Sequence, residues 1–177
     1  MEKGKSSDTG AVHSQKAILR LTSLLTPVKL RVDSSKGYSP ALELYMVVMI
    51  MKYTGVRVIQ ALRLKHSDIY DSCHVYFKGI KKGRDRIRIV PSFIVSMLLA
   101  YRPYLSETFS INYKYVYSNL RRLFNREFFI KGLCHFSICQ TFRKLAIRER
   151  YQDYKNNINS ICHEFGYKSK QSIAYYL

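Results

Sequence analysis

The sequence contains no tryptophan, only four cysteines and few acidic residues. The cysteines form no Cys-x-x-Cys pair and have no histidines at zinc-finger spacing, so the pattern favours reduced thiols over a zinc finger. Twelve Asp and Glu residues stand against thirty Lys and Arg residues, which gives a net charge of +18. A small domain of this charge has a strongly positive surface, and its expected partner is a polyanion such as nucleic acid.

Long hydrophobic runs are also missing. The longest run, Tyr45–Met51, ends at Lys52 and is far shorter than the ~20 residues that span a bilayer. The N-terminus is polar, and no apolar core follows Glu2 and Lys3, so a secretory signal is not expected. We therefore expect a cytoplasmic, nucleoid-associated protein without a membrane partner.

The 177 residues, 47% of them apolar, are enough for one domain with a hydrophobic core. Residues 1–38 read as a disordered or partly helical lead, and 39–177 as the folded domain. The segments 74–78 and 86–90 are rich in β-branched and aromatic residues and flank a glycine-bearing turn, which predicts a β-hairpin. Apolar periodicity predicts helices near 41–53, 56–64, 92–101, 115–127, 139–150, 155–165 and 169–177. The predicted fold is mainly α with a small antiparallel β-hairpin, an α+β class.

The segment 53–69 carries the first motif. It reads Tyr-Thr-Gly-Val-Arg-Val-Ile-Gln-Ala-Leu-Arg-Leu-Lys-His-Ser-Asp-Ile, with Arg57 behind a glycine turn. Taken alone, Arg57 is an ordinary surface arginine. The whole segment, however, resembles the first arginine box of the tyrosine recombinases, or phage integrases, which runs Thr-Gly-Leu-Arg-x-x-Glu and then Leu-x-Leu-x-x-Asp-Ile. The resemblance implies that Arg57 contacts the scissile phosphate, where a guanidinium fork can bond two oxygens at once.

The predicted hairpin falls where this family places its catalytic lysine. The family writes the turn as Lys-Thr-Gly-Arg before an Arg-x-Val-Pro strand, and residues 81–84 with 88–91 are similar. The resemblance implies that Lys81 protonates the leaving 5′ oxygen. Lys82 is the alternative, because counting back from Pro91 fits it about as well.

The third box is similar to the family's His-x-x-Arg motif, with glutamine in place of histidine. Gln140 and Arg143 stand three residues apart and so share a helix face. The resemblance implies that both face one phosphate, although an amide cannot take a proton from tyrosine as an imidazole can. Tyr167, twenty-four residues after Arg143, stands where the family's Leu-Gly-His-x-Ser box has its histidine.

Tyr176 lies nine residues after Tyr167, which is the family's usual spacing to the nucleophile, and Tyr175 is the alternative. The resemblance implies attack of this tyrosine on DNA to give a 3′-phosphotyrosine link, with no metal and no small-molecule cofactor. Double-stranded DNA is the implied partner, and a homo-oligomer on DNA is implied too. Further basic residues are expected along the duplex phosphates. These are Lys78, Lys82, Arg84, Arg86, Arg121, Arg122 and Lys144.

The resemblance covers 39–177, and we expect the chain to lack the N-terminal DNA-clamping domain of its relatives. Three functions fit the sequence. The first is an active site-specific recombinase or integrase. The second is a recombinase-fold DNA-binding protein with weak or lost cleavage, suggested by Gln140 and Tyr167. The third is an unrelated basic protein that binds RNA or DNA.

Overall fold

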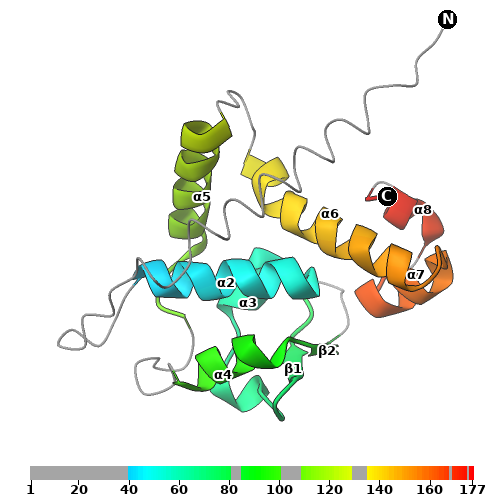
Figure 1. Ribbon diagram of the computed structural model, residues 1–177, viewed down its shortest axis with the longest axis horizontal. Coiled ribbons are helices and arrows are strands. Elements are labelled where there is room, and N and C mark those ends of the chain that lie inside the picture. The colour runs from blue at the N-terminus through cyan, green and yellow to red at the C-terminus, as the bar shows by residue number, and fades with distance from the viewer. Residues whose placement is uncertain (1–39, 81–84, 101–108, 129–134, 168, 175) are drawn as a thin grey trace, which may run out of the picture.

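The computed structural model describes residues 40–80, 85–100, 109–128, 135–167, 169–174 and 176–177. The lead 1–38, the turn residues Lys81, Lys82 and Arg84, and Tyr175 lie outside the described residues, so their predicted roles stay predictions. In chain order the described elements are α2 (Pro40–Thr54), α3 (Val58–Leu62), a 3₁₀ turn η2 (His66–Asp68), β1 (His74–Phe77), β2 (Arg86–Ile89), α4 (Ser92–Ala100), α5 (Tyr113–Phe128), α6 (His135–Asp153), α7 (Ile158–Phe165) and α8 (Lys170–Ala174) (Figure 1).

The predicted fold class is confirmed, because helices dominate the described chain and its sheet is a two-stranded antiparallel hairpin. Three of the predicted helices are shorter than expected, and one of them, predicted near 155–165, begins only at Ile158 behind the N-cap Asn157. The second predicted helix starts at Val58 because Arg57 is extended, with φ −71° and ψ 146°. The last ends at Ala174, and the main-chain N–H of Tyr176 turns back to the carbonyl of Ile173 at 2.7 Å. Within the described residues no helix is both long and apolar enough to cross a membrane.

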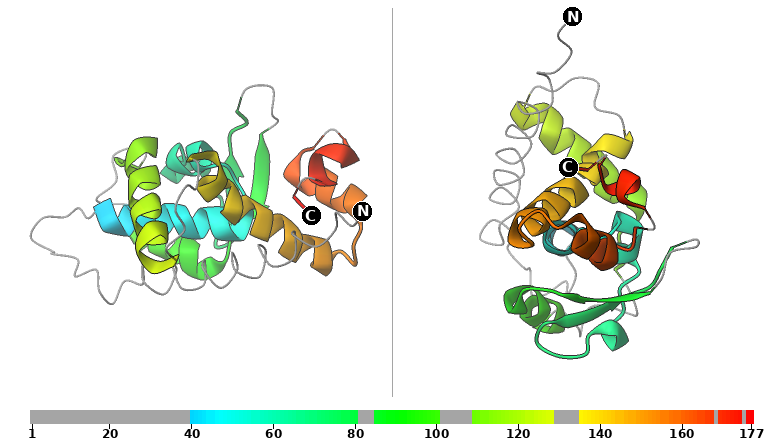
Figure 2. Two further views of the ribbon diagram at one scale, coloured as in Figure 1. Left: turned by 90° about the horizontal axis from the view of Figure 1, so that it is seen from above. Right: turned by 90° about the vertical axis from the view of Figure 1, so that its right-hand side faces the viewer.

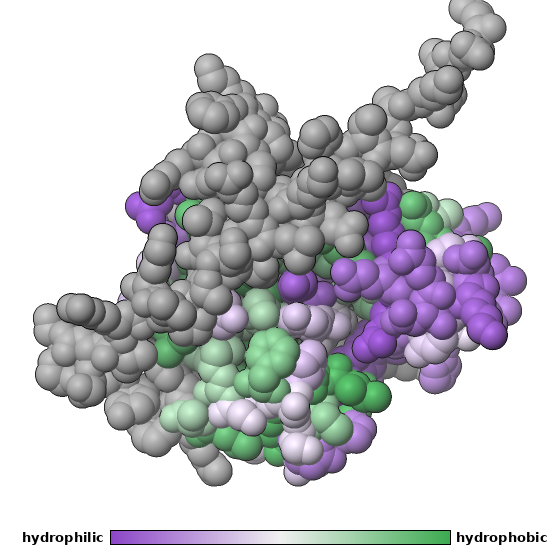
Figure 3. Space-filling view, in the orientation of Figure 1, coloured by the Kyte–Doolittle hydropathy of each residue, from purple (hydrophilic) through white to green (hydrophobic). Residues whose placement is uncertain are grey.

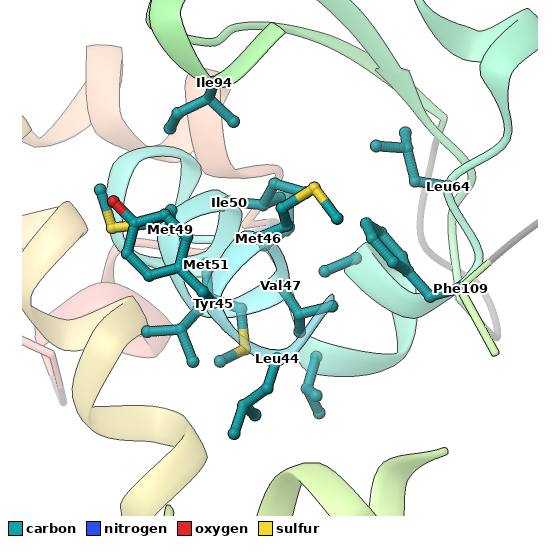
Figure 4. Packing of buried hydrophobic residues seen from close by; sticks show 14 of the residues in the cluster. Leu44, Tyr45, Met46, Val47, Met49, Ile50, Met51, Leu64, Ile94 and Phe109 are labelled. Atoms are coloured by element: carbon teal, nitrogen blue, oxygen red, sulfur yellow. The ribbon is translucent and has the colours of Figure 1, made fainter. Parts of the chain in front are cut away.

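Helix α2 is the core of the domain. Every residue from Leu44 to Met51 is buried, because α3, α4 and α6 all pack around this helix. Its side chains point outward in several directions, toward Ile94 of α4 and toward Leu64 and Phe109 (Figure 4). A helix covered on so many sides needs apolar residues all round, which is why this segment lacks an amphipathic pattern.

One acid lies inside this apolar helix. Glu43 is fully buried, and its Oε2 accepts hydrogen bonds from the main-chain N–H groups of Ser110 and Ile111 and from the Ser110 hydroxyl. Burial raises the pKa of Glu43, and these hydrogen bonds act in the opposite direction. The carboxyl group therefore ties the segment before α5 to the start of α2.

Strand β2 of the hairpin places its arginines inward and its isoleucines outward. Val75 pairs with Arg88 and Phe77 pairs with Arg86 across the two strands. Val75, Phe77 and Arg88 are buried, whereas Ile87 and Ile89 are 58% and 62% exposed. Figure 2 shows the hairpin lying beside α7, and Figure 3 shows hydrophilic side chains gathered on the right, where the C-terminal half of α6 and α7 lie. The inward arginines of β2 therefore face the C-terminal helices.

Gly55 ends α2 in a left-handed conformation, with φ 63°. A Cβ atom at this position would lie 2.5 Å from Cε1 of Phe165 and 3.0 Å from Cβ of Ala146. The close approach of α6 and α7 to this turn therefore requires glycine.

We predict that Gly55→Ala lowers the free energy of unfolding by about 2–4 kcal/mol, since left-handed strain and a steric clash combine. Urea denaturation followed by circular dichroism measures this change. Gly79→Ala is the matched control, because φ is positive at Gly55 and Gly166 but not at Gly79 among the described glycines. A loss for Gly55→Ala no larger than that of the control would contradict the prediction.

Candidate active site

Arg143 is the centre of the site and is only 4% exposed. Its Nη1 donates to the carbonyl oxygen of Gly55 at 2.6 Å, and its Nε donates to the hydroxyl oxygen of Tyr167 at 2.9 Å. These two bonds join α6 to the turn after α2 and to the segment after α7. Three segments that are distant in sequence therefore fix this guanidinium.

Aromatic rings surround the same guanidinium. Its central carbon lies 5.8 Å from the ring centroid of Phe165, 5.2 Å from that of Tyr167 and 5.9 Å from that of Tyr176. The two tyrosine rings are themselves 5.5 Å apart. Electron-rich ring faces attract a cation at these distances, so the rings help to stabilise a charge that is removed from water.

The structure brings Tyr176 and Gln140 together. The hydroxyl of Tyr176 donates to Oε1 of Gln140 at 3.3 Å, and the main-chain carbonyl of Tyr176 accepts from Nε of Arg148 at 3.1 Å. Both bonds run from the segment after α8 to α6. They hold the phenol of Tyr176 at the face of α6 that carries Gln140 and Arg143.

Tyr167 is held as a neutral phenol. Burial raises the pKa of Tyr167 to about 12, and a hydrogen bond with Tyr176 acts in the same direction. The positive charge of Arg143 lowers this pKa but does not outweigh burial. Tyr167 is therefore protonated and uncharged at neutral pH.

Arg57 faces the site from the other side. It is exposed at the start of α3, and its main-chain N–H donates to Oε1 of Gln60 at 3.1 Å. The side-chain amide of Gln60 also donates to the carbonyl of Lys78 at 2.9 Å. Gln60, to which the sequence argument gave no role, thus links the arginine turn to the end of β1. Gln60 stands three residues after Arg57, where the first arginine box of the tyrosine recombinases has glutamate. This position could have pointed to a role for Gln60.

Two adjoining cavities bring these residues into one place. Arg57, Gln140 and Arg143 line a cavity of ≈190 Å³. Arg57 and Arg143 also line a smaller cavity of ≈40 Å³, together with Arg88. The two arginines implied by the resemblance therefore lie between both hollows, next to the glutamine that bonds Tyr176.

Arg88 is a residue that the sequence argument did not single out. It is 7% exposed, its central carbon lies 4.6 Å over the ring of Phe165, and its Nη1 is 3.3 Å from Oε1 of Glu164. Burial is the main cause that lowers the pKa of Arg88 to about 10, so the side chain stays charged at neutral pH. Arginine and isoleucine alternate in β2, so the sequence shows that the two arginines share one face of the strand. The alternation does not show which face is buried.

Arg86 was expected to lie along DNA phosphates, and that role stays a prediction. Within the protein its Nη1 donates to the carbonyl oxygens of His163 and, at 3.0 Å, Glu164. These carbonyls close the C-terminal end of α7, where a cation is favourable. The guanidinium also lies against Gly166, at φ 71°, where a Cβ atom would collide with it. Arg86 therefore fastens β2 to α7.

The other predicted DNA contacts lie at or near the surface. Lys78 is exposed just after β1, and Arg121 and Arg122 are exposed on α5. Lys144 is half-buried on α6, one residue after Arg143. Their contact with DNA stays a prediction.

One group among the described residues offers several metal-ligand atoms. Asp71, Cys73 and His74 bring theirs within 4.8 Å of one another at the start of β1. Oδ1 of Asp71 accepts from two main-chain N–H groups, and its Oδ2 lies 2.8 Å from Nδ1 of His74. These bonds show that the three residues form the turn that begins β1. None of them lines the two cavities at Arg57 and Arg143.

The fold resembles that of solved recombinases. The XerH site-specific recombinase bound to its difH substrate superposes with a TM-score of 0.67 at 16% identity, over 93% of this chain and 48% of that one. The catalytic domain of bacteriophage HP1 integrase superposes with a TM-score of 0.63 at 16% identity, over 91% of this chain and 83% of that one. XerA recombinase superposes with a TM-score of 0.59 at 18% identity, over 99% of this chain and 60% of that one. The fold is that of a tyrosine recombinase catalytic domain.

The recombinase fold was thus predicted correctly from the motifs. The chain spans about half the length of the XerH recombinase. No protein-family model and no curated protein matches the sequence. At these identities the similarity establishes the fold, and the chemistry has to be argued from the residues of the site.

We predict that Tyr167→Phe lowers the free energy of unfolding by about 1.5–3 kcal/mol at pH 7, because the buried Arg143 loses a hydrogen-bond acceptor. The folded-state pKa of Tyr167 is raised, so this contribution is fully present below its ordinary pKa of 10 and is lost as the pH rises toward 12. Denaturation of both proteins at pH 7 and pH 9 should therefore give the same difference.

Tyr70→Phe is the control for that experiment, since the side chain of Tyr70 is 63% exposed. Equal stability of wild type and Tyr167→Phe at pH 7 would show that the bond to Arg143 contributes nothing.

Proposed function

We propose that this chain is the catalytic domain, 39–177, of a site-specific DNA recombinase or integrase that cleaves and rejoins duplex DNA through a 3′-phosphotyrosine intermediate. One observation carries the proposal. The hydroxyl of Tyr176 bonds Gln140, and its ring lies 5.9 Å from the buried guanidinium of Arg143, beside a cavity that Arg57 also lines. A nucleophile next to fixed cations suits attack on a phosphate.

In the proposed reaction the phenol oxygen of Tyr176 bonds to the scissile phosphorus while the bond from phosphorus to the 5′ oxygen breaks. The phenol proton passes to water, and the 5′ oxygen receives a proton from the hairpin lysine, Lys81 or Lys82. The phosphotyrosine bond retains the energy of the phosphodiester. Attack by a 5′ hydroxyl therefore reverses the step and rejoins DNA without a nucleotide cofactor.

Arg143 and Arg57 have different roles in the proposed reaction. Arg143 is committed to Gly55 and Tyr167 through Nη1 and Nε, so it acts as a fixed buried charge with part of its donors left for a phosphate. Arg57 is exposed at the rim and offers a fork that can bond two phosphate oxygens. Both stabilise the negative charge that develops on the phosphate during attack.

Duplex DNA is the proposed partner. The net charge of +18 supports this, as does the similarity to a recombinase solved with its difH substrate. We also propose a homo-oligomer on DNA and a nucleoid location, since exchange of strands requires two duplexes to be cut together. The exposed cations Lys78, Arg121 and Arg122 would bind backbone phosphates outside the cleaved one.

A second function is favoured by two residues of the site. Gln140 and Tyr167, which both contact Tyr176, are neutral at neutral pH, and neither has an imidazole that could accept the phenol proton. A recombinase-fold protein that binds DNA and cleaves slowly or not at all fits this chemistry. The experiments below separate it from the active enzyme.

We predict that wild-type protein and Tyr175→Phe form a covalent adduct with nicked duplex DNA, whereas Tyr176→Phe forms none, because Tyr176 supplies the attacking oxygen. A library of duplexes with a randomised core and a nick at a fixed position removes the need to know the target site. Adducts are separated on a denaturing gel and their DNA is sequenced.

Adduct from Tyr176→Phe but not from Tyr175→Phe would assign the nucleophile to Tyr175. Duplex binding with no adduct from wild type would support the second function. Preference for RNA of the same sequences over duplex DNA would overturn both.

We predict that Gln140→His raises the rate of adduct formation by on the order of 100-fold, since an imidazole at the 3.3 Å contact can accept the proton of Tyr176. The rate of this variant should rise with pH through about 6.5, the ordinary pKa of histidine. Gln140→Met is the control, because it fills similar space without an acceptor. A histidine variant no faster than wild type would show that proton removal from Tyr176 does not limit cleavage.

A further inference from the structure

Arg88 is a buried arginine at the edge of the proposed phosphate site. It lies on the inward face of β2, opposite Val75, and is 7% exposed. It lines the same ≈40 Å³ cavity as Arg57 and Arg143. The cavity thus has arginines from three separate parts of the chain on its walls.

Its hydrogen bonds are incomplete. Nε and Nη1 of Arg88 are inaccessible to solvent and, within the described residues, have no hydrogen-bond partner. Glu164 is close enough to Nη1, at 3.3 Å, for an ion pair but is not oriented for a hydrogen bond. A buried cation without its hydrogen bonds is costly, so such groups need a structural or functional explanation.

The neighbouring arginines do not share this property. Arg86 is fastened to the carbonyls of His163 and Glu164. Arg150 is 40% exposed and pairs with Asp153 at 3.3 Å and with Glu164 at 3.7 Å. Arg88 alone of these three is both nearly buried and short of hydrogen-bond acceptors.

We infer that Arg88 is a third arginine of the phosphate pocket and contacts the same phosphate as Arg57 and Arg143, an inference that rests on the proposed function. The phosphate provides a negative partner for this guanidinium, whose hydrogen bonds within the described residues are incomplete. Arg88 also supplies positive charge that the neutral Gln140 and Tyr167 do not.

Glu164 is the counterion of this third arginine when DNA is absent. Its carboxylate pairs with both Arg88 and Arg150, and the cavity that it lines with them does not include Arg57. A phosphate that enters the pocket competes with Glu164 for Arg88, and Arg150 then keeps Glu164 paired. Arg88 can therefore pair with Glu164 when DNA is absent and with the phosphate when DNA is bound.

The test removes Arg88 alone, because Glu164 keeps its ion pair with Arg150 and is not left unpaired. Arg88→Met is compared with Arg150→Met, which leaves Glu164 paired with Arg88 and whose arginine does not line the cavity. At saturating nicked duplex we expect adduct formation to fall on the order of 100-fold in the first variant and to stay within about 3-fold of wild type in the second. Arg88→Lys, which keeps the charge, should recover part of the rate and serves if Arg88→Met does not fold.

A second measurement does not depend on cleavage. Inorganic tungstate, a tetrahedral anion that mimics phosphate, is titrated into each protein by calorimetry. We expect the Arg88 variant to bind it at least about 10-fold more weakly than the Arg150 variant.

Equal adduct rates and equal tungstate affinities in Arg88→Met and Arg150→Met would overturn the role of Arg88, while a wild-type adduct would leave the proposed function standing. If wild type binds tungstate but forms no adduct, cleavage is rejected, and the tungstate comparison alone decides whether Arg88 belongs to the anion site.

Discussion

The buried guanidinium of Arg143 is the constraint on which the rest of the site depends. Its bonds to the Gly55 carbonyl and to the Tyr167 hydroxyl fix the turn after α2 and the segment after α7 against α6. The glycine turn must be left-handed and free of a Cβ atom so that Phe165 can approach. A single charge placed inside the protein thus determines where the C-terminal segment with Tyr176 can lie.

The hairpin is attached to the same assembly by its own arginines. Arg86 closes the end of α7, while Arg88 lies over Phe165 and pairs with Glu164. Hydrogen bonds and an ion pair therefore join strand β2 to α7. Because Gln60 also holds the end of β1 at Lys78, the hairpin is fixed on both strands next to the arginine turn.

Much of the fold and part of the candidate site could be predicted from the sequence, for physical reasons. A largely apolar segment, 41–53, followed by Gly55 identified α2, and the change of period identified the hairpin. Order and spacing of the motifs pointed to Arg57, Arg143 and Tyr176. The inward direction of Arg86 and Arg88 could not be predicted, because alternation defines two faces of a strand without saying which is buried. The interior partners of these arginines come from α7, some seventy-five residues further on, and local patterns carry no information on such pairs.

The pocket holds its arginines in place without a substrate, and the phenol of Tyr176 bonds a neutral amide. We propose that one phosphate meets several of these groups at once. A crystal structure of the protein with a nicked duplex tests this most directly. We predict one phosphate in hydrogen-bond contact with both Arg57 and Arg143, with the Tyr176 hydroxyl facing its phosphorus. Phosphates bound only at exposed lysines and arginines, with Arg143 contacting protein alone, would contradict it.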